Sequence, residues 1–266
     1  VVCCGGRLSG ISLSPNILGP MCMLSCIMSV YYIKENSKNT KIIILHVMFF
    51  LIDAYLQYLT DCRSAFAATL AVVVLFILFS IKKYRKTISL ICLIGILILA
   101  ICMPALLTML SNATGRDWVT GSGRTYIFKE SFQLIKQKPL LGYGTVSNYL
   151  DAAHDANLSH LGSNVGTHNI YIEIAILYGI PVLICFLASI LTLFIKLLCV
   201  YLKDKDLFSL KLAQPTLLMS FILVFGLFEH HGVFRLTPPI MFLVLPFFVL
   251  RKNLDLSFKQ EEKQIG

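Results

Sequence analysis

The chain has 266 residues, of which 57% are hydrophobic and only 14% are charged, and its mean hydropathy is +0.78. A soluble domain averages about 25% charged residues, so this composition excludes an ordinary soluble protein and indicates an integral membrane protein. The net charge of +9 then fits lysines that meet anionic lipid at the cytoplasmic face of a membrane, and it does not suggest a nucleic-acid partner.

Seven apolar segments approach or exceed the roughly 20 residues that a helix needs to cross a bilayer. Lysines gather in every second connection between these segments, and the positive-inside rule places such connections in the cytoplasm. The sequence therefore predicts an all-α integral membrane protein with about seven transmembrane helices. The expected spans are residues 17–33, 42–59, 64–81, 88–110, 170–201, 212–229 and 236–250.

The spans divide the chain into three predicted regions. Residues 1–110 carry transmembrane helices 1 to 4, and residues 170–266 carry helices 5 to 7 and a short cytoplasmic tail. Between them, residues 111–169 form a large, partly helical extracytoplasmic loop, and connections of this length are usually functional. The chain starts with VVCCGG, without an initiator Met or a signal peptide, so we expect it to begin inside a longer protein.

Lysine and arginine are distributed differently across the predicted membrane. Thirteen of the sixteen lysines fall on the inner side, whereas five of the seven arginines fall on the outer side. The positive-inside rule explains only the lysines. Because arginine has a planar fork that suits phosphate, we interpret the outer arginines as a shared anion-binding site, with unrelated surface arginines as the alternative. They are Arg7, Arg63, Arg116, Arg124 and Arg235.

The outer loop contains one clear helical pattern, over residues 124–138, which Pro139 ends. Such an amphipathic helix could lie flat in the lipid headgroup region. The LLGYG segment at 140–144 is a glycine-rich turn and is too weak a signal to predict a phosphate loop. His154 and His160 lie in a polar run and are interpreted as solvated. The apolar stripe of the helix comprises Phe128, Phe132 and Ile135, with Ile127 and Leu134 beside it.

The 170–201 segment is too long for one span, because a continuous helix would measure about 48 Å against roughly 30 Å of hydrocarbon. The Gly179-Ile180-Pro181 sequence predicts a break, and hence a short outer helix over 169–178. His168 stands at the start of that helix, where the partial positive charge favours a neutral imidazole. A general base must be neutral, so His168 is our candidate base, with a capping or interfacial histidine as the alternative.

Three further groups of polar residues could carry chemistry. Asp53 lies in the second span, where a carboxylate often marks function but could equally pair with an arginine to hold the bundle. Glu229-His230-His231 has metal-ligand residue types, but adjacent helical positions point apart, so we expect no metal site and no cofactor. Residues 204–206 (DKD) are interpreted as a solvated charge run.

Four short motifs follow one another along the chain. They are Arg7 to Gly10 with Ser14-Pro15-Asn16, Cys62-Arg63-Ser64, Arg124 followed by Pro139 to Gly144, and His168-Asn169 with Tyr171, Glu173 and Gly179. In this order, they resemble the O-antigen ligase and polysaccharide polymerase superfamily of bacterial membrane glycosyltransferases. Cys62 stands where that family usually has Ser.

This resemblance implies a GT-C-like fold, an N-terminally truncated chain and a metal-independent, inverting glycosyltransferase in the bacterial cytoplasmic membrane, with its active site on the extracytoplasmic side. The donor would be a polyprenyl-diphosphate-linked glycan, and the acceptor would be a glycan or a lipid A core. The resemblance places this reaction in the assembly of capsule, exopolysaccharide or lipopolysaccharide. Other proteins of envelope polysaccharide assembly would then be partners. Arg63 and Arg124 would hold the diphosphate and His168 would activate the acceptor. Arg7, Arg116, Arg235, Asn169 and Asp53 are expected to contribute to substrate binding.

Two other classes of protein compete with this interpretation. A transporter of lipid-linked glycans or organic anions would use the same arginines as a pathway, but transporters typically have midplane charges and related halves. Asp53 is the one carboxylate well inside a predicted span, and the sequence has no evident internal repeat. A non-catalytic membrane scaffold would need no special surroundings for His168.

Overall fold

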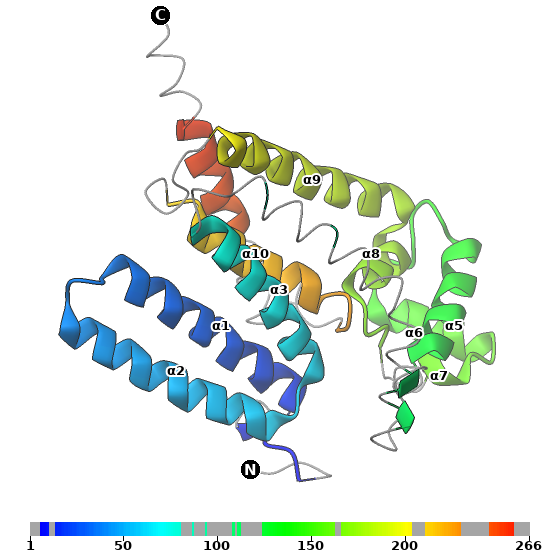
Figure 1. Cartoon of the computed structure of the whole chain (residues 1–266). Coiled ribbons are helices and arrows are strands. Elements are labelled where there is room, and N and C mark those ends of the chain that lie inside the picture. Colours follow the sequence, from blue (N-terminus) through cyan, green and yellow to red (C-terminus); the bar gives the residue numbers. More distant parts are fainter. Residues whose placement is uncertain are drawn as a thin grey trace, which may run out of the picture. The chain divides into compact units, whose positions relative to one another are not determined.

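The computed structural model describes residues 6–10, 14–80, 124–162, 166–203, 211–229 and 245–257, with isolated positions at 87, 94, 108–109 and 111–112. The elements of these residues are helices (Figure 1). The chain forms two compact units, one comprising residues 1–80 and 193–266 and the other comprising residues 81–192.

The first unit is built on three consecutive antiparallel helices, α1 (Pro15–Glu35), α2 (Thr40–Thr60) and α3 (Arg63–Ser80). Their bounds lie within two residues of the first three predicted spans. Ser14 caps α1 by accepting a hydrogen bond from the backbone of Asn16, and proline occupies the first helical position. Lys34 Nζ donates to Ser80 Oγ over 2.6 Å, which places the ends of α1 and α3 on one side.

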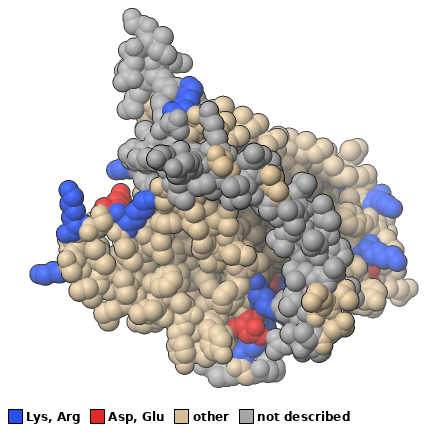
Figure 2. Space-filling model, viewed as in Figure 1, with Lys and Arg blue, Asp and Glu red and all other residues tan. Residues whose placement is uncertain are grey.

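Four helices of the described residues are long and apolar enough to cross a membrane, namely α1, α2, α3 and α9 (Ile180–Leu202). On the face shown in Figure 2, the charged side chains of the α1–α2 hairpin lie toward its two ends, with an uncharged surface between them. Expected span 88–110 falls outside the described residues, apart from isolated positions. Seven spans and an extracytoplasmic loop therefore stay predictions, whereas the all-helical class is confirmed.

The sixth predicted span differs in length from the observed helix. α10 (Ala213–Phe225) has 13 residues and ends at its cap Gly226, where residues 226–228 form a turn, so it is shorter than the span expected over 212–229. At about 1.5 Å per residue, it measures roughly 20 Å. Residues 245–257 are helical and include the charged pair Arg251 and Lys252, whereas residues 236–244 of the last expected span lie outside the described residues.

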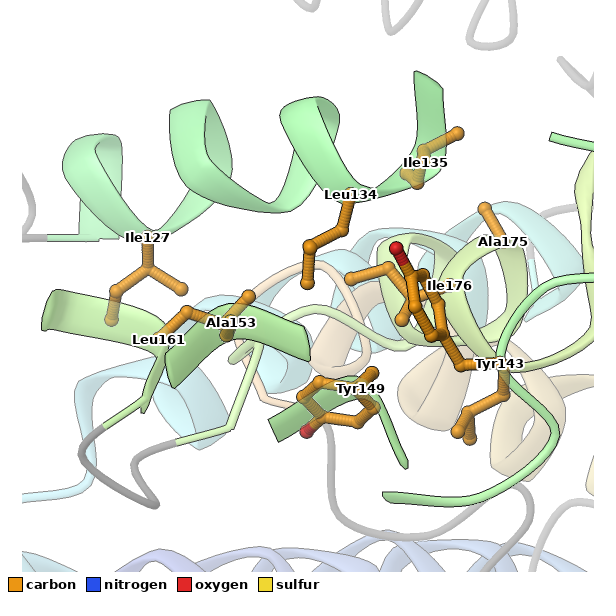
Figure 3. Packing of buried hydrophobic residues seen from close by; sticks show 10 residues of the cluster. Ile127, Leu134, Ile135, Tyr143, Tyr149, Ala153, Leu161, Ala175 and Ile176 are labelled. Carbon is orange, nitrogen blue, oxygen red and sulfur yellow. The ribbon is translucent and has the colours of Figure 1, made fainter. Parts of the chain in front are cut away.

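The second unit has a small hydrophobic core of its own. It comprises α5 (Arg124–Gln137), α6 (Val146–Asp155), α7 (Ser159–Gly162), α8 (Ile170–Tyr178) and the first part of α9. Leu134, Tyr149, Leu161 and Ile176 are fully buried in this core (Figure 3). The predicted break between 178 and 181 is confirmed, because α8 ends at Tyr178 and α9 begins at Ile180.

Two expectations for the loop need correction. The buried face of α5 consists of Ile127, Ser131, Leu134 and Ile135, whereas Phe132 of the predicted stripe is 55% exposed. The helix buries this face against α6, α7 and α8. Packing against protein, and not contact with lipid headgroups, therefore determines which face of α5 is buried. The polar run that contains His154 and His160 folds into α6 and α7, because Tyr149, Ala153 and Leu161 are drawn into the core.

Candidate active site

Arg7 ties the segment before α1 to the end of α2. Its Nε donates to the carbonyl of Thr60 over 2.8 Å, and its Nη2 donates to the carbonyl of Asp61 over 3.0 Å and to Asn16 Oδ1 over 3.2 Å. These three bonds use main-chain and amide acceptors of the protein itself. Arg7 therefore stabilises the turn between α2 and α3, in addition to any role in binding an anion.

Asn16 links Arg7 to a buried carboxylate. Its Nδ2 donates to Glu229 Oε1 over 3.0 Å, and Glu229, four residues beyond the end of α10, is only 1% exposed. A buried carboxylate is costly unless hydrogen bonds stabilise it, which this amide provides in part. The chain Arg7–Asn16–Glu229 thus joins the beginning of α1 to the segment that follows α10. His230 and His231 lie outside the described residues.

The turn between α2 and α3 positions Arg63. Asp61 ends α2 in a left-handed conformation (φ +46°), and the buried Gln57 side chain donates to the carbonyl of Cys62 over 3.1 Å. Cys62 is buried, with its Sγ 3.4 Å from Ser64 Oγ. Arg63 then begins α3 with an exposed side chain. Cys62, which replaces the serine of the family motif, is therefore packed into an ordered turn.

Burial raises the pKa of the Cys62 thiol above its ordinary value, and the neighbouring Glu229 carboxylate acts in the same direction. The hydrogen bond with Ser64 and the positive charge of Arg7 act in the opposite direction. The net effect keeps this thiol protonated and makes it a poor nucleophile. Asp53, the other acidic candidate of this unit, lies half-buried on α2, one helical turn before Gln57.

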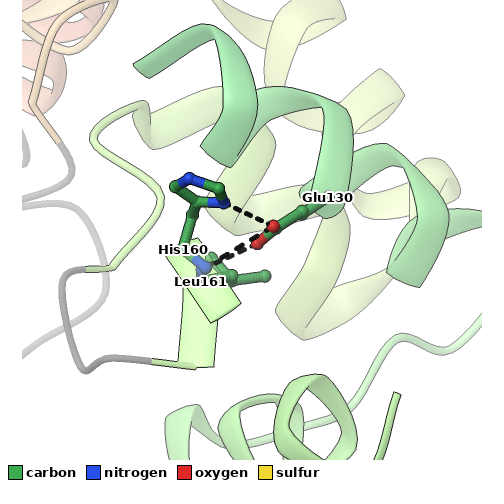
Figure 4. A network of polar contacts seen from close by, with 3 residues as sticks. All are labelled: Glu130, His160 and Leu161. Carbon is green, nitrogen blue, oxygen red and sulfur yellow. Dashed lines mark hydrogen bonds and ion pairs between the residues drawn. The ribbon is translucent and has the colours of Figure 1, made fainter. Parts of the chain in front are cut away.

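In the second unit, Arg124 is the first residue of α5 and is half-buried. Glu130, farther along α5, fixes the neighbouring helix α7 (Figure 4). Its Oε1 lies 2.8 Å from His160 Nδ1, and its Oε2 accepts from the backbone of Leu161 over 2.8 Å. The His160 ring also stacks on Tyr126, with centroids 5.1 Å apart. His160 was expected to be merely solvated; it is exposed but serves to anchor α7.

The LLGYG segment is a docking turn and not a phosphate loop. Tyr143 and Gly144 donate from their backbones to the carbonyls of Ile176 and Leu177 at 2.8 and 2.7 Å, and Ile180 donates to Pro139 at 2.7 Å. Gly142 has φ +64°, and a Cβ there would meet those α8 carbonyls at 2.5 Å. Glycine is thus required by both backbone conformation and close approach, and the turn is fastened to the junction of α8 and α9.

His168 has a backbone conformation that side chains rarely adopt, with φ +49°. It directly precedes Asn169, the N-cap of α8, whose Oδ1 accepts from Tyr171 and Ile172 at 2.9 and 3.0 Å. His168 therefore lies one position before the helix cap. Non-glycine residues in this region carry a strain of about 1–3 kcal/mol, and such residues gather at functional sites.

Thr167 and Glu173 hold this strained turn from beneath. Thr167 is fully buried, and its hydroxyl lies 3.0 Å from the carbonyl of Asn169 and 3.2 Å from Glu173 Oε2, so it can donate to either. Glu173, in the first turn of α8, is only 5% exposed. Its place in the H-N-x-Y-x-E motif was visible in the sequence, but its contact with Thr167 was not.

The candidate residues divide between the two units. Arg7, Asp53 and Arg63 belong to the first unit, and Arg7 contacts the turn that carries Arg63. Arg124, His168 and Asn169 belong to the second. Arg116 and Arg235 lie outside the described residues. Among the described residues, no group of three or more His, Cys, Asp or Glu side chains could hold a metal ion.

Long apolar helices together with buried polar networks at the helix ends define the class of an all-α, multi-pass membrane protein. A family model described as O-antigen ligase matches residues 48–187, which is 140 of the 266 residues. The chain therefore belongs to the O-antigen ligase family, whose members are glycan ligases and polymerases. The matched region contains Arg63, Arg124 and His168. Neither a search of curated proteins nor a search of solved structures found a match.

Proposed function

We propose that this protein transfers or polymerises an oligosaccharide linked to polyprenyl diphosphate at the outer leaflet of the bacterial cytoplasmic membrane. Membership of the O-antigen ligase family and the four apolar helices support this reaction class and a membrane-embedded donor. The acceptor is the hydroxyl of a growing glycan or of a lipid A core, and repeat-unit polymerisation is our first choice.

His168 is the proposed general base. It takes the proton of the acceptor hydroxyl while that oxygen bonds to the anomeric carbon of the donor, and the bond from this carbon to the diphosphate oxygen breaks. A single displacement of this kind inverts the anomeric configuration. The diphosphate leaves with its negative charge on oxygen, so the step requires charge stabilisation more than acid catalysis. Arg63 and Arg124 provide it as planar forks, without a metal ion.

One observation carries the proposal: His168, the histidine of the family motif, is held at φ +49° over a buried Thr167–Glu173 contact. This conformation has a cost, and the surrounding residues are arranged to maintain it. His154, in contrast, is an exposed residue within α6. Backbone strain at the histidine that also begins the family motif supports a functional role for it.

The test is glycan transfer from purified lipid-linked donor by the full-length protein. A positioned base contributes about 10²–10⁴-fold, so His168→Ala should lose at least about a hundredfold of the activity. His154→Ala, the matched control, should stay near wild type, whereas His160 is a poor control because it anchors α7. Retention of a tenth or more of the activity by His168→Ala would place the base elsewhere, with Asp53 next. Loss of wild-type transfer in EDTA would refute the metal-free mechanism.

The arginine clamp has a separate test. Arg63→Lys and Arg124→Lys keep the positive charge but lose the two-pronged geometry, so both should lose transfer severely. Arg116→Lys, outside the family motifs, should have a mild effect. Full activity of both Lys variants would show that charge alone suffices and would refute the clamp.

Polymerase and ligase differ in what accumulates when the protein is deleted from the cell. Single repeat units on the polyprenyl diphosphate would identify a polymerase, whereas long chains stranded on the lipid would identify a ligase. Unchanged lipid-linked glycans would contradict both reactions.

A further inference from the structure

The turn between α5 and α6, which is fastened to the junction of α8 and α9, exposes two adjacent leucines beside the start of a candidate membrane helix. Leu140 is 69% exposed. Leu141 is 86% exposed, which is the highest value among the large hydrophobic side chains of the described residues. Neither side chain belongs to the core of its unit. Adjacent exposed leucines are unusual in a loop that only contacts water. The residues around the pair therefore indicate what covers the two side chains.

The backbone of the turn is fixed against the first residues of α9. The N–H of Ile180 donates to Pro139 over 2.7 Å, and Gly179 packs directly on the carbonyl of Leu140, where a Cβ would collide. Ile180 begins a helix of 23 residues that is long and apolar enough to cross a membrane. The leucine pair therefore lies at the level where this candidate span begins.

Exposed apolar residues also lie along α9, the helix to whose first residues the turn is fastened. Ile184 is 60% exposed and Leu187 is 44% exposed, on a helix that the protein itself covers very little. At about 1.5 Å per residue, the helix measures roughly 34 Å against about 30 Å of hydrocarbon. Its first residues thus reach the boundary between acyl chains and headgroups, and the leucines lie beside them.

Exposed lysines flank the pair on the side of α5. Lys136 and Lys138 precede it by a few residues, and Lys138 Nζ lies 4.6 Å from the centre of the Tyr143 ring. Figure 2 shows basic side chains on the surface over α5. Exposed apolar side chains with lysines beside them are typical of a segment that inserts shallowly into a bilayer.

We propose that Leu140 and Leu141 insert into the bilayer next to the first residues of α9 and anchor the unit that contains α5 to α8 to the membrane surface. Lys136 and Lys138 then lie at the level of the lipid headgroups. The occupant of this exposed apolar tip is lipid, because the turn is fastened to the start of α9, a candidate membrane span whose own apolar side chains are exposed. The anchor fixes the height of the turn, and through it the α8 helix that follows His168. It does not depend on which reaction the protein catalyses.

Tryptophan fluorescence tests the anchor directly, since Trp118 is the only tryptophan of the chain. In a Trp118→Phe background, Leu141→Trp is placed in nanodiscs of phosphatidylcholine with brominated acyl chains. Leu187→Trp serves as the lipid-facing reference and His154→Trp as the exposed one. The anchor predicts emission at shorter wavelength for Leu141→Trp than for His154→Trp, and quenching by bromolipid close to that of Leu187→Trp. Leu140→Trp replaces any Leu141→Trp protein that fails to fold.

Three results would overturn the anchor. Emission and aqueous acrylamide quenching equal to those of His154→Trp would place the leucines in water. Protection from both bromolipid and acrylamide would show that protein covers them, for instance a second copy of the chain. Equal bromolipid quenching at positions 141 and 154 would show that the whole loop lies on the bilayer, without a leucine-specific anchor.

Discussion

Replacement of Thr167 by valine tests whether the turn beneath His168 is built for function. Valine keeps the shape of threonine but removes the hydroxyl that lies 3.2 Å from Glu173 Oε2 and 3.0 Å from the carbonyl of Asn169. The residue is fully buried, so water cannot readily replace the lost contact. His168 itself is unchanged, so any effect on transfer must act through its position.

The magnitude follows from the contact and the strain. A hydrogen bond contributes about 1 kcal/mol with a neutral partner and up to about 3 kcal/mol with a charged one. This matches the roughly 1–3 kcal/mol that a left-handed histidine costs, so without the hydroxyl the turn can relax. Because each 1.36 kcal/mol is about tenfold in rate, we expect a loss of transfer of roughly 5- to 150-fold.

Transfer from purified lipid-linked donor, with helix content measured by circular dichroism, separates positioning from misfolding. Thr167→Ser retains the hydroxyl and should restore most of the activity. Thr192→Val is the matched control, because the Thr192 hydroxyl donates to the carbonyl of Ala188 within α9 and supports no turn. Wild-type transfer by Thr167→Val would refute the reasoning, as would an equal loss in Thr167→Ser and Thr167→Val.

Three further predictions concern stability and reactivity. Gly142→Ala should lower the unfolding temperature in detergent far more than Gly144→Ala, because both positions have positive φ but only a Cβ at Gly142 meets main-chain carbonyls. Asn16→Ala should cost about 1–3 kcal/mol by removing the link between Arg7 and Glu229, whereas Asn36→Ala removes only an exposed bond and should cost little. Cys62 should be alkylated very slowly at pH 8, since its raised pKa leaves less thiolate than a free cysteine; rapid alkylation, seen by mass spectrometry, would contradict its burial.

The long helices were predictable because their composition alone places them in a membrane. α1, α2 and α3 follow apolar runs of span length, and the break at Gly179 follows from a proline two residues later and from the length limit of a bilayer. α10 is different, because nine of its residues are buried in the protein. An apolar run of protein-buried residues resembles a lipid-facing run in sequence, so its length did not indicate a full span.

The face of α5 and the existence of α6 could not be predicted from local pattern. An amphipathic helix has one apolar stripe whether lipid or protein covers it, and only the partner decides between Phe132 and Leu134 as the buried residue. α6 is rich in polar residues, and packing of Tyr149 and Ala153 against α5 and α8 stabilises it. Such short helices depend on tertiary contacts that no sequence window contains.

Two buried carboxylates of the described residues each belong to a polar network beside a candidate site residue. Glu229 reaches through Asn16 and Arg7 to the turn that begins α3 at Arg63, and Glu173 reaches Thr167 beneath His168. In the first network, the turn with Asp61 at φ +46° directly precedes Arg63, and in the second the residue at φ +49° is His168 itself. A motif such as H-N-x-Y-x-E therefore combines one residue proposed to face the substrate with others that hold it in place. Substitution should separate the two kinds, because loss of a holding residue is rescued by a conservative replacement and loss of the base is not.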